Sequence, residues 1–258
     1  MKIAVCQLNI QYLGYEENIN RAEKFICEAA RNHAEIIVFP EMSFTGFSME
    51  TAKTSLVGNN ACDEMQKIAV RKQIGIGFGW VRSTEIGLAE NHYSFFNKAG
   101  EMILDYIKIH PFSYAKENDF FQAGTSLPTA SLCGLPFMSV ICYDLRFPEL
   151  FRLRAKTVCA AFVPANWPAK RSSHWKALLQ ARAIENQMYI IGVNCVGEQD
   201  GLVYSGDSMI LAPDGTILCD CRSDEGLFYA DILQETVLTA REGFPALRDM
   251  REELYLKL

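Results

Sequence analysis

Residues 139–149, with the sequence SVICYDLRFPE, decide how the rest of the chain is interpreted. The apolar run 136–141 is typical of a strand, and it stops at Cys142, ahead of residues 149–154, which have a helical pattern. A thiol at such a corner lies near backbone N–H groups and the positive end of a helix dipole, which are expected to lower its pKa. Free cysteines are otherwise among the most buried residues of proteins. The other segments therefore decide whether Cys142 is a nucleophile or a core residue.

Short apolar runs and amphipathic helical patterns alternate along the chain, which predicts an α/β fold. Strands are expected at residues 2–8, 35–39, 74–81, 91–97, 102–107, 127–132, 136–141, 158–163, 188–195, 208–211, 217–219 and 226–231. Helices are expected at residues 16–32, 61–72, 146–156 and 172–186, and in the tail from about residue 233.

Segment 42–60 has no clear period, so we predict a loop there, with a short helix near 49–54. Ser172 or Ser173 is expected to cap the helix that begins at this point. No linker, internal repeat or low-complexity segment interrupts the chain. Residues 1–258 are therefore predicted to form a single domain.

The composition is that of an ordinary globular protein with enough apolar residues for a large core. Of the 258 residues, 49% are hydrophobic and 22% are charged, and the formal net charge is -6. This charge, without any cluster of Lys and Arg, argues against a nucleic-acid partner. No apolar run reaches the roughly 18 residues of a membrane span, and residues 1–12 lack the pattern of a signal peptide. We expect a cytoplasmic protein without a membrane partner.

The nine cysteines lack the regular spacing of a disulfide framework, and their number is odd. Reduced thiols are therefore expected. The only close pair is Cys219 and Cys221, and the four histidines are scattered along the sequence. Because zinc sites need clustered Cys and His ligands, we predict no metal site, and nothing in the sequence indicates a cofactor.

Four polar residues share one position, because each follows an apolar strand within a few residues: Glu41, Lys108, Cys142 and Asn166. Ligand sites of α/β sheets form outside the carboxyl ends of strands, so these side chains are expected to meet in one crevice, although any single one could be a solvated loop residue. A thiol with an ordinary pKa of about 8.5 is mostly protonated at neutral pH, so it needs a base, and Glu41 is the candidate. Lys108 and the backbone N–H of Tyr143 are candidates for stabilising the oxyanion of a tetrahedral intermediate.

Three motifs resemble those of the carbon–nitrogen hydrolases of the nitrilase superfamily, whose catalytic residues are Glu, Lys and Cys. They are the segment 39–41 (FPE), Lys108, and the segment 142–149 (CYDLRFPE). The likeness extends over nearly the whole chain. Four further motifs are similar to the bacterial omega-amidase branch: 165–168 (ANWP), 174–175 (HW), 181–187 (ARAIENQ) and 206–208 (GDS). Together these motifs are far more specific than any one alone.

The resemblance implies a four-layer αββα sandwich assembled as a homodimer, with the tail from about residue 233 at the dimer interface. It also implies that Glu41 takes the proton of Cys142, that the thiolate attacks an amide carbonyl, and that ammonia leaves with a thioester on the enzyme. Water activated by Glu41 then releases the acid. Many members have a second glutamate after the lysine, and Glu117 matches it, nine positions after Lys108. Its expected role is to orient Lys108 and the leaving ammonia, with a loop surface charge as the alternative.

An omega-amidase acts on a small molecule that carries a terminal amide and a distal carboxylate, such as α-ketoglutaramate or succinamate. A bidentate arginine is the natural partner of a carboxylate, and Arg171 is the candidate, with an exposed residue at a helix start as the alternative. Arg146 is expected instead in a structural ion pair, because it stands beside Asp144 and Glu149. The predicted substrate-binding residues are Phe47, Tyr143, Asn166, Trp167 and Arg171, with the side chains of Phe47 and Trp167 as walls of a small pocket.

Other functions stay open at this point. A thiol hydrolase of the same fold could instead act on a nitrile, a carbamoyl amide or deaminated glutathione. A non-catalytic interaction subunit is the third possibility, and the presence of Glu41, Lys108 and Cys142 counts against it. A papain-like protease is disfavoured, because no histidine has the context of a Cys–His pair.

Overall fold

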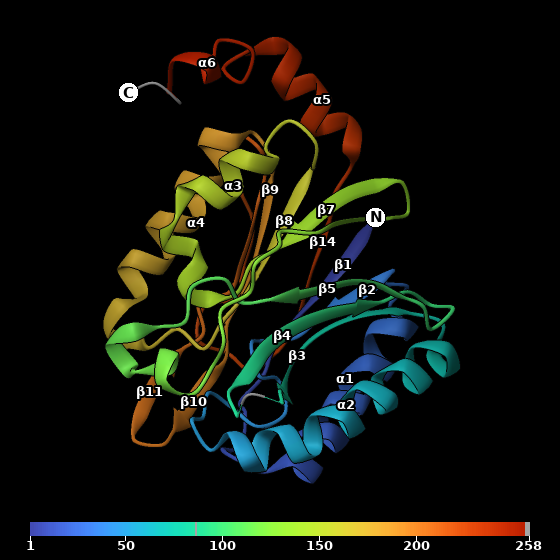
Figure 1. Cartoon of the computed structure of the whole chain (residues 1–258). Coiled ribbons are helices and arrows are strands. Elements are labelled where there is room, and N and C mark those ends of the chain that lie inside the picture. The colour runs from blue at the N-terminus through green and yellow to red at the C-terminus, as the bar shows by residue number, and fades with distance from the viewer. Residues whose placement is uncertain (86, 256–258) are drawn as a thin grey trace.

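Two β-sheets pack face to face at the centre of the protein (Figure 1). The computed structural model describes residues 1–85 and 87–255, and in this part of the chain each sheet has six strands. The first sheet has the order β14 (Gly226–Asp231), β1 (Lys2–Gln7), β2 (Ile36–Val38), β3 (Gly75–Ser83), β4 (Ala89–Phe96) and β5 (Met102–Ile107). The second sheet has the order β13 (Ile217–Asp220), β12 (Met209–Leu211), β9 (Tyr189–Val193), β8 (Ala160–Pro164), β7 (Leu135–Ser139) and β6 (Thr129–Leu132).

The central strands of each sheet are parallel, and the outer ones are antiparallel. The parallel strands are β1, β2 and β3 in the first sheet and β7, β8 and β9 in the second. All residues of β2 and β8 are buried, which explains why their sequences are continuously apolar. Because parallel strands end at the same edge of a sheet, each sheet presents several strand ends close together.

Helices cover the outer face of each sheet (Figure 1). The helices α1 (Tyr15–Arg31) and α2 (Thr51–Lys72) lie on the first sheet, whereas α3 (Pro148–Arg154) and α4 (Ser172–Asn186) lie on the second. In α1 the buried residues Ile19, Ala22, Ile26 and Ala29 have the helical spacing expected of a helix that packs on a sheet. The layer order is helix, sheet, sheet, helix, and it confirms the predicted αββα sandwich.

The C-terminal part of the described chain forms α5 (Gln234–Gly243) and the short α6 (Glu252–Tyr255), which lie beyond one end of the sandwich (Figure 1). The side chain of Arg241 donates hydrogen bonds to the backbone oxygens of Val158 and Gln187, so α5 is attached to the second sheet. Within residues 1–85 and 87–255, no helix combines the length and the apolar character needed to cross a membrane.

Aromatic side chains fill the space between the two sheets. Phe95 of β4 contacts Phe137 of β7 and Phe162 of β8, with ring centroids 4.9 Å and 5.0 Å apart. The three rings are buried and tilted against one another, an arrangement that aromatic pairs favour. This packing fixes how the strand ends of one sheet lie relative to those of the other.

The short helix predicted near 49–54 corresponds to the start of α2, which begins at Thr51. The loop predicted for the rest of the segment is wrong from residue 55 onward, because α2 continues to Lys72 as one helix. Gly58 lies within this helix. In the structure α2 lies so close to β3 at this point that a Cβ on Gly58 would be 1.9 Å from the backbone oxygen of Val81. Gly58 therefore permits a close helix–sheet contact and does not break the helix.

Two further differences from the sequence-based expectation lie near the second sheet. The hairpin β10 (Val196–Gln199) and β11 (Leu202–Ser205) was not predicted, although its turn contains the pair Asp200–Gly201, which favours tight turns. The predicted cap of α4 is wrong as well. Among the described residues no side chain caps this helix, because the hydroxyl of Ser172 donates to the carboxylate of Asp207 (2.7 Å).

Candidate active site

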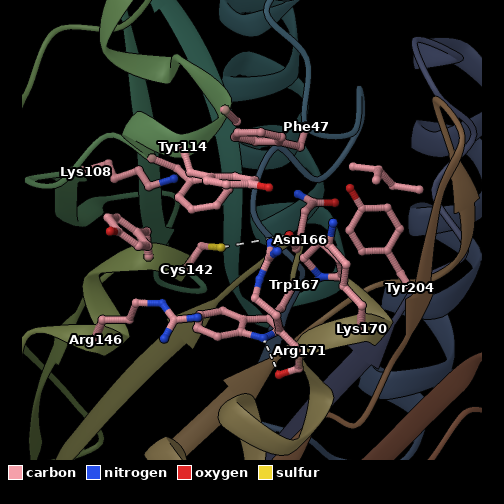
Figure 2. A pocket seen from close by; sticks show the side chains of 15 residues that line it. Phe47, Lys108, Tyr114, Cys142, Arg146, Asn166, Trp167, Lys170, Arg171 and Tyr204 are labelled. Carbon is pink, nitrogen blue, oxygen red and sulfur yellow. Dashed lines mark hydrogen bonds between the residues drawn. The ribbon is translucent and has the colours of Figure 1, made fainter.

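The four predicted strand-end residues meet at one edge of the sandwich. Glu41 follows β2 and Lys108 follows β5 in the first sheet, whereas Asn166 follows β8 in the second. Cys142 follows β7 and begins the 3-10 helix η3 (Cys142–Arg146). Figure 2 shows the thiol of Cys142 near Lys108 and Asn166. The strand ends of the two sheets thus bring together side chains that are far apart in the sequence.

Lys108 lies between two carboxylates. Its Nζ atom donates to Oε1 of Glu41 (2.8 Å) and to Oε1 and Oε2 of Glu117 (3.1 Å and 2.9 Å). All three side chains are at most 1% exposed. Burial alone would lower the pKa of Lys108, but the charges of Glu117 and Glu41 outweigh it and raise this pKa above its ordinary value. Lys108 is therefore held as a cation.

Glu117 comes from the 3-10 helix η2 (Glu117–Asp119) in the segment between β5 and β6. It is buried, so the alternative of a loop surface charge is wrong for this residue. Burial raises the pKa of Glu117, and the charge of Lys108 opposes this shift. Because the backbone N–H of Phe112 donates to its carboxylate, Glu117 also anchors the segment that precedes it.

Asn91 is a member of this group that the sequence analysis missed. Its amide donates to Oε1 of Glu41 (2.9 Å) and to Oε1 of Glu117 (3.2 Å), and its backbone oxygen accepts the N–H of Lys108 (2.9 Å). Asn91 stands inside β4, so the rule that ligand sites form after strand ends does not indicate it. Four of the eight residues of this buried strand are polar or charged, so the sequence pattern alone does not single out Asn91.

The two oxygens of Glu41 have unequal numbers of partners. Oε1 accepts both Asn91 and Lys108, whereas Oε2 accepts the backbone N–H of Asn166 (3.0 Å). A carboxylate oxygen accepts about two hydrogen bonds, so Oε2 keeps a lone pair. Oε2 is therefore the oxygen that can take a proton.

The backbone of Cys142 has a φ of +48°, a region that residues other than glycine rarely adopt. Its Sγ atom lies 3.9 Å from the backbone oxygen of Asn166. The expectation of a lowered thiol pKa is wrong: burial and then the negative charge of Glu41 raise the pKa of Cys142 well above its ordinary value, and Lys108 opposes them. The thiol at rest is neutral, which increases its need for a base.

Asp144 connects the turn that carries Cys142 to the end of β5 through hydrogen bonds. Its Oδ2 atom accepts the hydroxyl of Tyr106 (2.8 Å) and the backbone N–H of Ile141 (3.0 Å), while Oδ1 accepts the backbone N–H and the ring Nδ1 of His110 (2.9 Å and 2.8 Å). Tyr106 and His110 flank Lys108 in the sequence. The buried carboxylate thus fixes the turn that carries Cys142 relative to Lys108.

A pocket of about 140 Å³ opens in front of Cys142 (Figure 2). The aromatic ring of Phe47 lies over Lys108, with Nζ 5.4 Å from the ring centroid. The indole of Trp167 donates to the backbone oxygen of Arg171 (2.8 Å) and so holds the loop on the opposite side. The predicted residues Phe47, Tyr143, Asn166, Trp167 and Arg171 all line this pocket.

Besides Lys108, three cationic side chains line the pocket: Arg146, Lys170 and Arg171. The guanidinium of Arg146 lies 4.8 Å from a ring centroid of Trp167, and that of Arg171 lies 5.4 Å from the ring centroid of Phe112. The predicted ion pair of Arg146 with Asp144 and Glu149 is wrong: within residues 1–85 and 87–255 Arg146 has no carboxylate within 4.0 Å. The reason is that Asp144 is turned toward the end of β5, while Arg146 stacks on the aromatic wall.

Comparisons with known proteins agree with this geometry. The model of the carbon–nitrogen hydrolase family matches residues 2–242. The chain belongs to this family. The 2-oxoglutaramate amidase of Bacillus subtilis (strain 168) is 34% identical over 258 residues, which cover 98% of each protein. The omega-amidase YafV of Escherichia coli (strain K12) is 37% identical over 220 residues, 85% of this chain and 81% of that protein.

A solved structure has the same fold. The crystal structure of XC1258 from Xanthomonas campestris, a CN-hydrolase superfamily protein with an arsenic adduct in its active site, matches with a TM-score of 0.91 at 27% identity. The match covers 97% of both chains. These findings confirm the predicted resemblance to the nitrilase superfamily and to its omega-amidase-like branch.

The side chains of this carbon–nitrogen hydrolase suit acyl transfer through sulfur. The Cys142 thiol and the Lys108 ammonium line one pocket, and the Glu41 carboxylate, which has a free lone pair on Oε2, lies buried against Lys108. In the described residues 1–85 and 87–255, no group of three or more His, Cys, Asp or Glu side chains could hold a metal ion. The chemistry that these residues can perform is nucleophilic attack with a carboxylate base.

Proposed function

We propose that this carbon–nitrogen hydrolase is an omega-amidase. It cleaves the terminal amide of small ω-amido acids, of the α-ketoglutaramate or succinamate type, to the carboxylic acid and ammonia. The observation that carries the proposal is the buried ion pair of Glu41 and Lys108, since Lys108 and the thiol of Cys142 line a small pocket that also contains two arginines. The relatives named 2-oxoglutaramate amidase and omega-amidase, at 34% and 37% identity, support the substrate class.

In the acylation half of the reaction, Glu41 takes the proton of Cys142 on Oε2 while the sulfur attacks the amide carbon. The carbonyl oxygen becomes an oxyanion, which the ammonium of Lys108 and the backbone N–H of Tyr143 stabilise. Glu41 then gives the proton to the leaving nitrogen. The C–N bond breaks, ammonia leaves, and the acyl group stays on sulfur as a thioester.

In the second half, water enters the space that ammonia has left. Glu41 takes a proton from this water, and the hydroxide attacks the thioester carbon. The C–S bond breaks as the second tetrahedral intermediate collapses, and the proton returns to the sulfur. The products are the free acid and the neutral Cys142 thiol with which the cycle began.

Glu117 has a positioning role in this scheme. Two of the three Nζ hydrogen bonds of Lys108 go to its carboxylate, and the remaining one goes to Glu41. Glu117 thereby holds the ammonium over the site and, together with Glu41, keeps it charged. This agrees with the role that the family resemblance implies for the residue.

The cations of the pocket bind the distal end of the substrate. Arg171 is the primary partner of the distal carboxylate, and Arg146 is a second guanidinium within the same pocket. Phe47 and Trp167 form apolar walls between this end and the thiol. The small volume and the positive charge favour a short ω-amido acid over a neutral nitrile or a larger peptide-like amide.

The test is ammonia release from a panel of short ω-amides, carbamoyl amides, nitriles and deaminated glutathione. We expect the highest kcat/KM with α-ketoglutaramate or succinamate, and Cys142→Ala should abolish turnover while the far-UV circular dichroism spectrum is unchanged. If the wild-type protein released no ammonia from any short ω-amide, the proposal would be refuted. Faster turnover of a nitrile or a carbamoyl amide would favour the alternative hydrolases instead.

We also propose that residues 1–258 form one domain and that two copies associate as a homodimer through a surface that includes the tail from about residue 233. The exposed apolar side chains of Leu233, Leu238 and Phe244 support such a contact. Light scattering after size exclusion, with Phe244→Glu as the variant, tests whether the protein is a dimer.

We propose a cytoplasmic location. All nine cysteines are free, which supports a reducing compartment such as the cytoplasm.

A further inference from the structure

Asn166 connects the base to the nucleophile. Its backbone N–H donates to Oε2 of Glu41 (3.0 Å), its amide nitrogen donates to the backbone oxygen of Glu41 (2.6 Å), and its backbone oxygen is the one near Sγ of Cys142. The amide must present nitrogen, not oxygen, to the Glu41 carbonyl. The orientation of this one side chain therefore helps to fix the carboxylate that accepts the proton.

Two further buried side chains, those of Cys195 and Gln199, fix the orientation of this amide through its oxygen. The thiol of Cys195 donates to Oδ1 of Asn166 (3.1 Å), and Nε2 of Gln199 donates to the same oxygen (3.4 Å) and to the sulfur of Cys195 (3.2 Å). All three residues are at most 4% exposed. If the Asn166 amide were flipped, its NH₂ group would face these donors and its oxygen would face the Glu41 carbonyl. The three hydrogen bonds that this amide makes would then be lost.

Cys195 and Gln199 come from segments of the chain other than those that carry Glu41, Cys142 and Asn166. Cys195 follows β9, and Gln199 ends β10, the hairpin strand that leaves the second sheet. The side chain of Gln199 passes close to Gly46, where a Cβ would be 2.3 Å from its Oε1 atom. Gly46 has a φ of +75°, so the backbone needs glycine here for its conformation as well as for the passage of Gln199.

We propose that Cys195 and Gln199 are positioning residues of the amidase reaction, which hold the amide of Asn166 and through it direct the Glu41 carboxylate toward Cys142. The proposal rests on the amidase function given above. Neither residue touches the pocket, so their effect on catalysis acts through Asn166. Burial raises the pKa of the Cys195 thiol, so it keeps its proton and remains a donor over the working pH range.

The test compares Cys195→Ala, Cys195→Ser and Gln199→Leu with the wild-type protein. Cys159→Ala and Cys159→Ser are matched controls, because Cys159 is also a buried thiol and lies at the opposite end of β8 from Asn166. The side-chain oxygen of Gln199 is buried without a partner among the described residues, so leucine removes an unsatisfied atom and is not expected to unfold the protein.

Three quantities are measured for each variant: kcat and KM with succinamate, the pH midpoint of Cys142 alkylation by iodoacetamide, and the melting temperature. For Cys195→Ala and Gln199→Leu we expect kcat to fall by about 10-fold to 100-fold with KM changed by less than about twofold, since a misdirected base affects chemistry more than binding. Their alkylation midpoints should move to lower pH, because the negative charge of Glu41 moves away from the sulfur. Cys195→Ser keeps a donor and should retain most of the activity.

Equal kcat values and equal alkylation midpoints in Cys195→Ala and Cys159→Ala would overturn the proposal, as would a Cys195→Ser variant that is as impaired as Cys195→Ala. If Cys195→Ala fails to fold, Gln199→Leu decides alone. The alkylation midpoints need no amide substrate. They therefore decide the positioning role even if the wild-type protein turned over no ω-amide and the proposed function itself failed.

Discussion

The ammonium of Lys108 lies 2.8 Å from the carboxylate of Glu41, and both side chains are at most 1% exposed. In the proposed reaction Glu41 can act as the base, because Lys108 contacts Oε1 only, whereas Oε2 has a single backbone donor and can accept a proton. The same pair thus provides a proton acceptor and, once the proton has moved, a cation for the oxyanion.

Replacing Lys108 by methionine should cost stability as well as activity. Lys108→Met leaves Glu41 and Glu117 facing each other without a cation, and breaking a buried ion pair on one side costs about 3–5 kcal/mol. We expect the free energy of unfolding in urea to fall by about this amount and ammonia release to be lost.

The double variant Lys108→Met/Glu117→Gln is the control for this prediction. It removes one of the two unpaired carboxylates, so it should recover part of the lost stability and none of the activity. A single variant as stable as the wild-type protein would contradict the view that the ion pair is needed to bury these carboxylates.

Replacing Glu41 by glutamine should change turnover and thiol ionisation in opposite directions. The negative charge of Glu41 is, after burial, the main cause that raises the pKa of Cys142. Removing this charge lowers that pKa, so the pH midpoint of Cys142 alkylation by iodoacetamide should move down in Glu41→Gln, while kcat falls by about 100-fold or more for want of a base. An alkylation midpoint that stayed in place, or moved up, would show that Glu41 does not act on the thiol.

The sequence predicts the buried strands and the residues at their ends well, because the patterns that indicate them are local. The continuous apolar runs of β2 and β8 indicated buried strands, and residues after strands indicated Glu41, Lys108, Cys142 and Asn166 as neighbours. These inferences need only the period of the pattern and the rule that ligand sites form at strand ends.

The errors concern properties that depend on burial and on partners from other segments. The direction of the Cys142 pKa shift was predicted from the helix start alone, whereas burial and Glu41, which comes from the other sheet, decide it. Arg146 was assigned to its sequence neighbours, although Asp144 is already engaged by Tyr106 and His110. Such competition between partners is a three-dimensional property.

Asp144 should be required for the position of the nucleophile. Asn in its place has one acceptor oxygen and an NH₂ group, which would face either the donors of Tyr106 and Ile141 or those of His110. We expect Asp144→Asn to lower the free energy of unfolding by about 1–3 kcal/mol, and to lower kcat more than it changes KM. Glu149→Gln, an exposed carboxylate of the same segment, is the control and should leave both unchanged. A wild-type kcat in Asp144→Asn would mean that the turn needs no such anchor.

Arg171 and Arg146 should differ from all of these residues, because the role proposed for their guanidinium groups is to bind the distal carboxylate. Loss of a charge-assisted hydrogen bond costs about 1.5–3 kcal/mol, so Arg171→Ala should raise KM for succinamate about tenfold or more with little change in kcat. Arg146→Ala should have a smaller effect in the same direction, because its guanidinium is also held over the rings of Trp167 and Tyr143. The discriminating substrate is butyramide, which has the same chain length without the carboxylate. Neither variant should alter KM for butyramide, and an equal rise for both substrates would show that the arginines shape the pocket and do not bind the distal carboxylate.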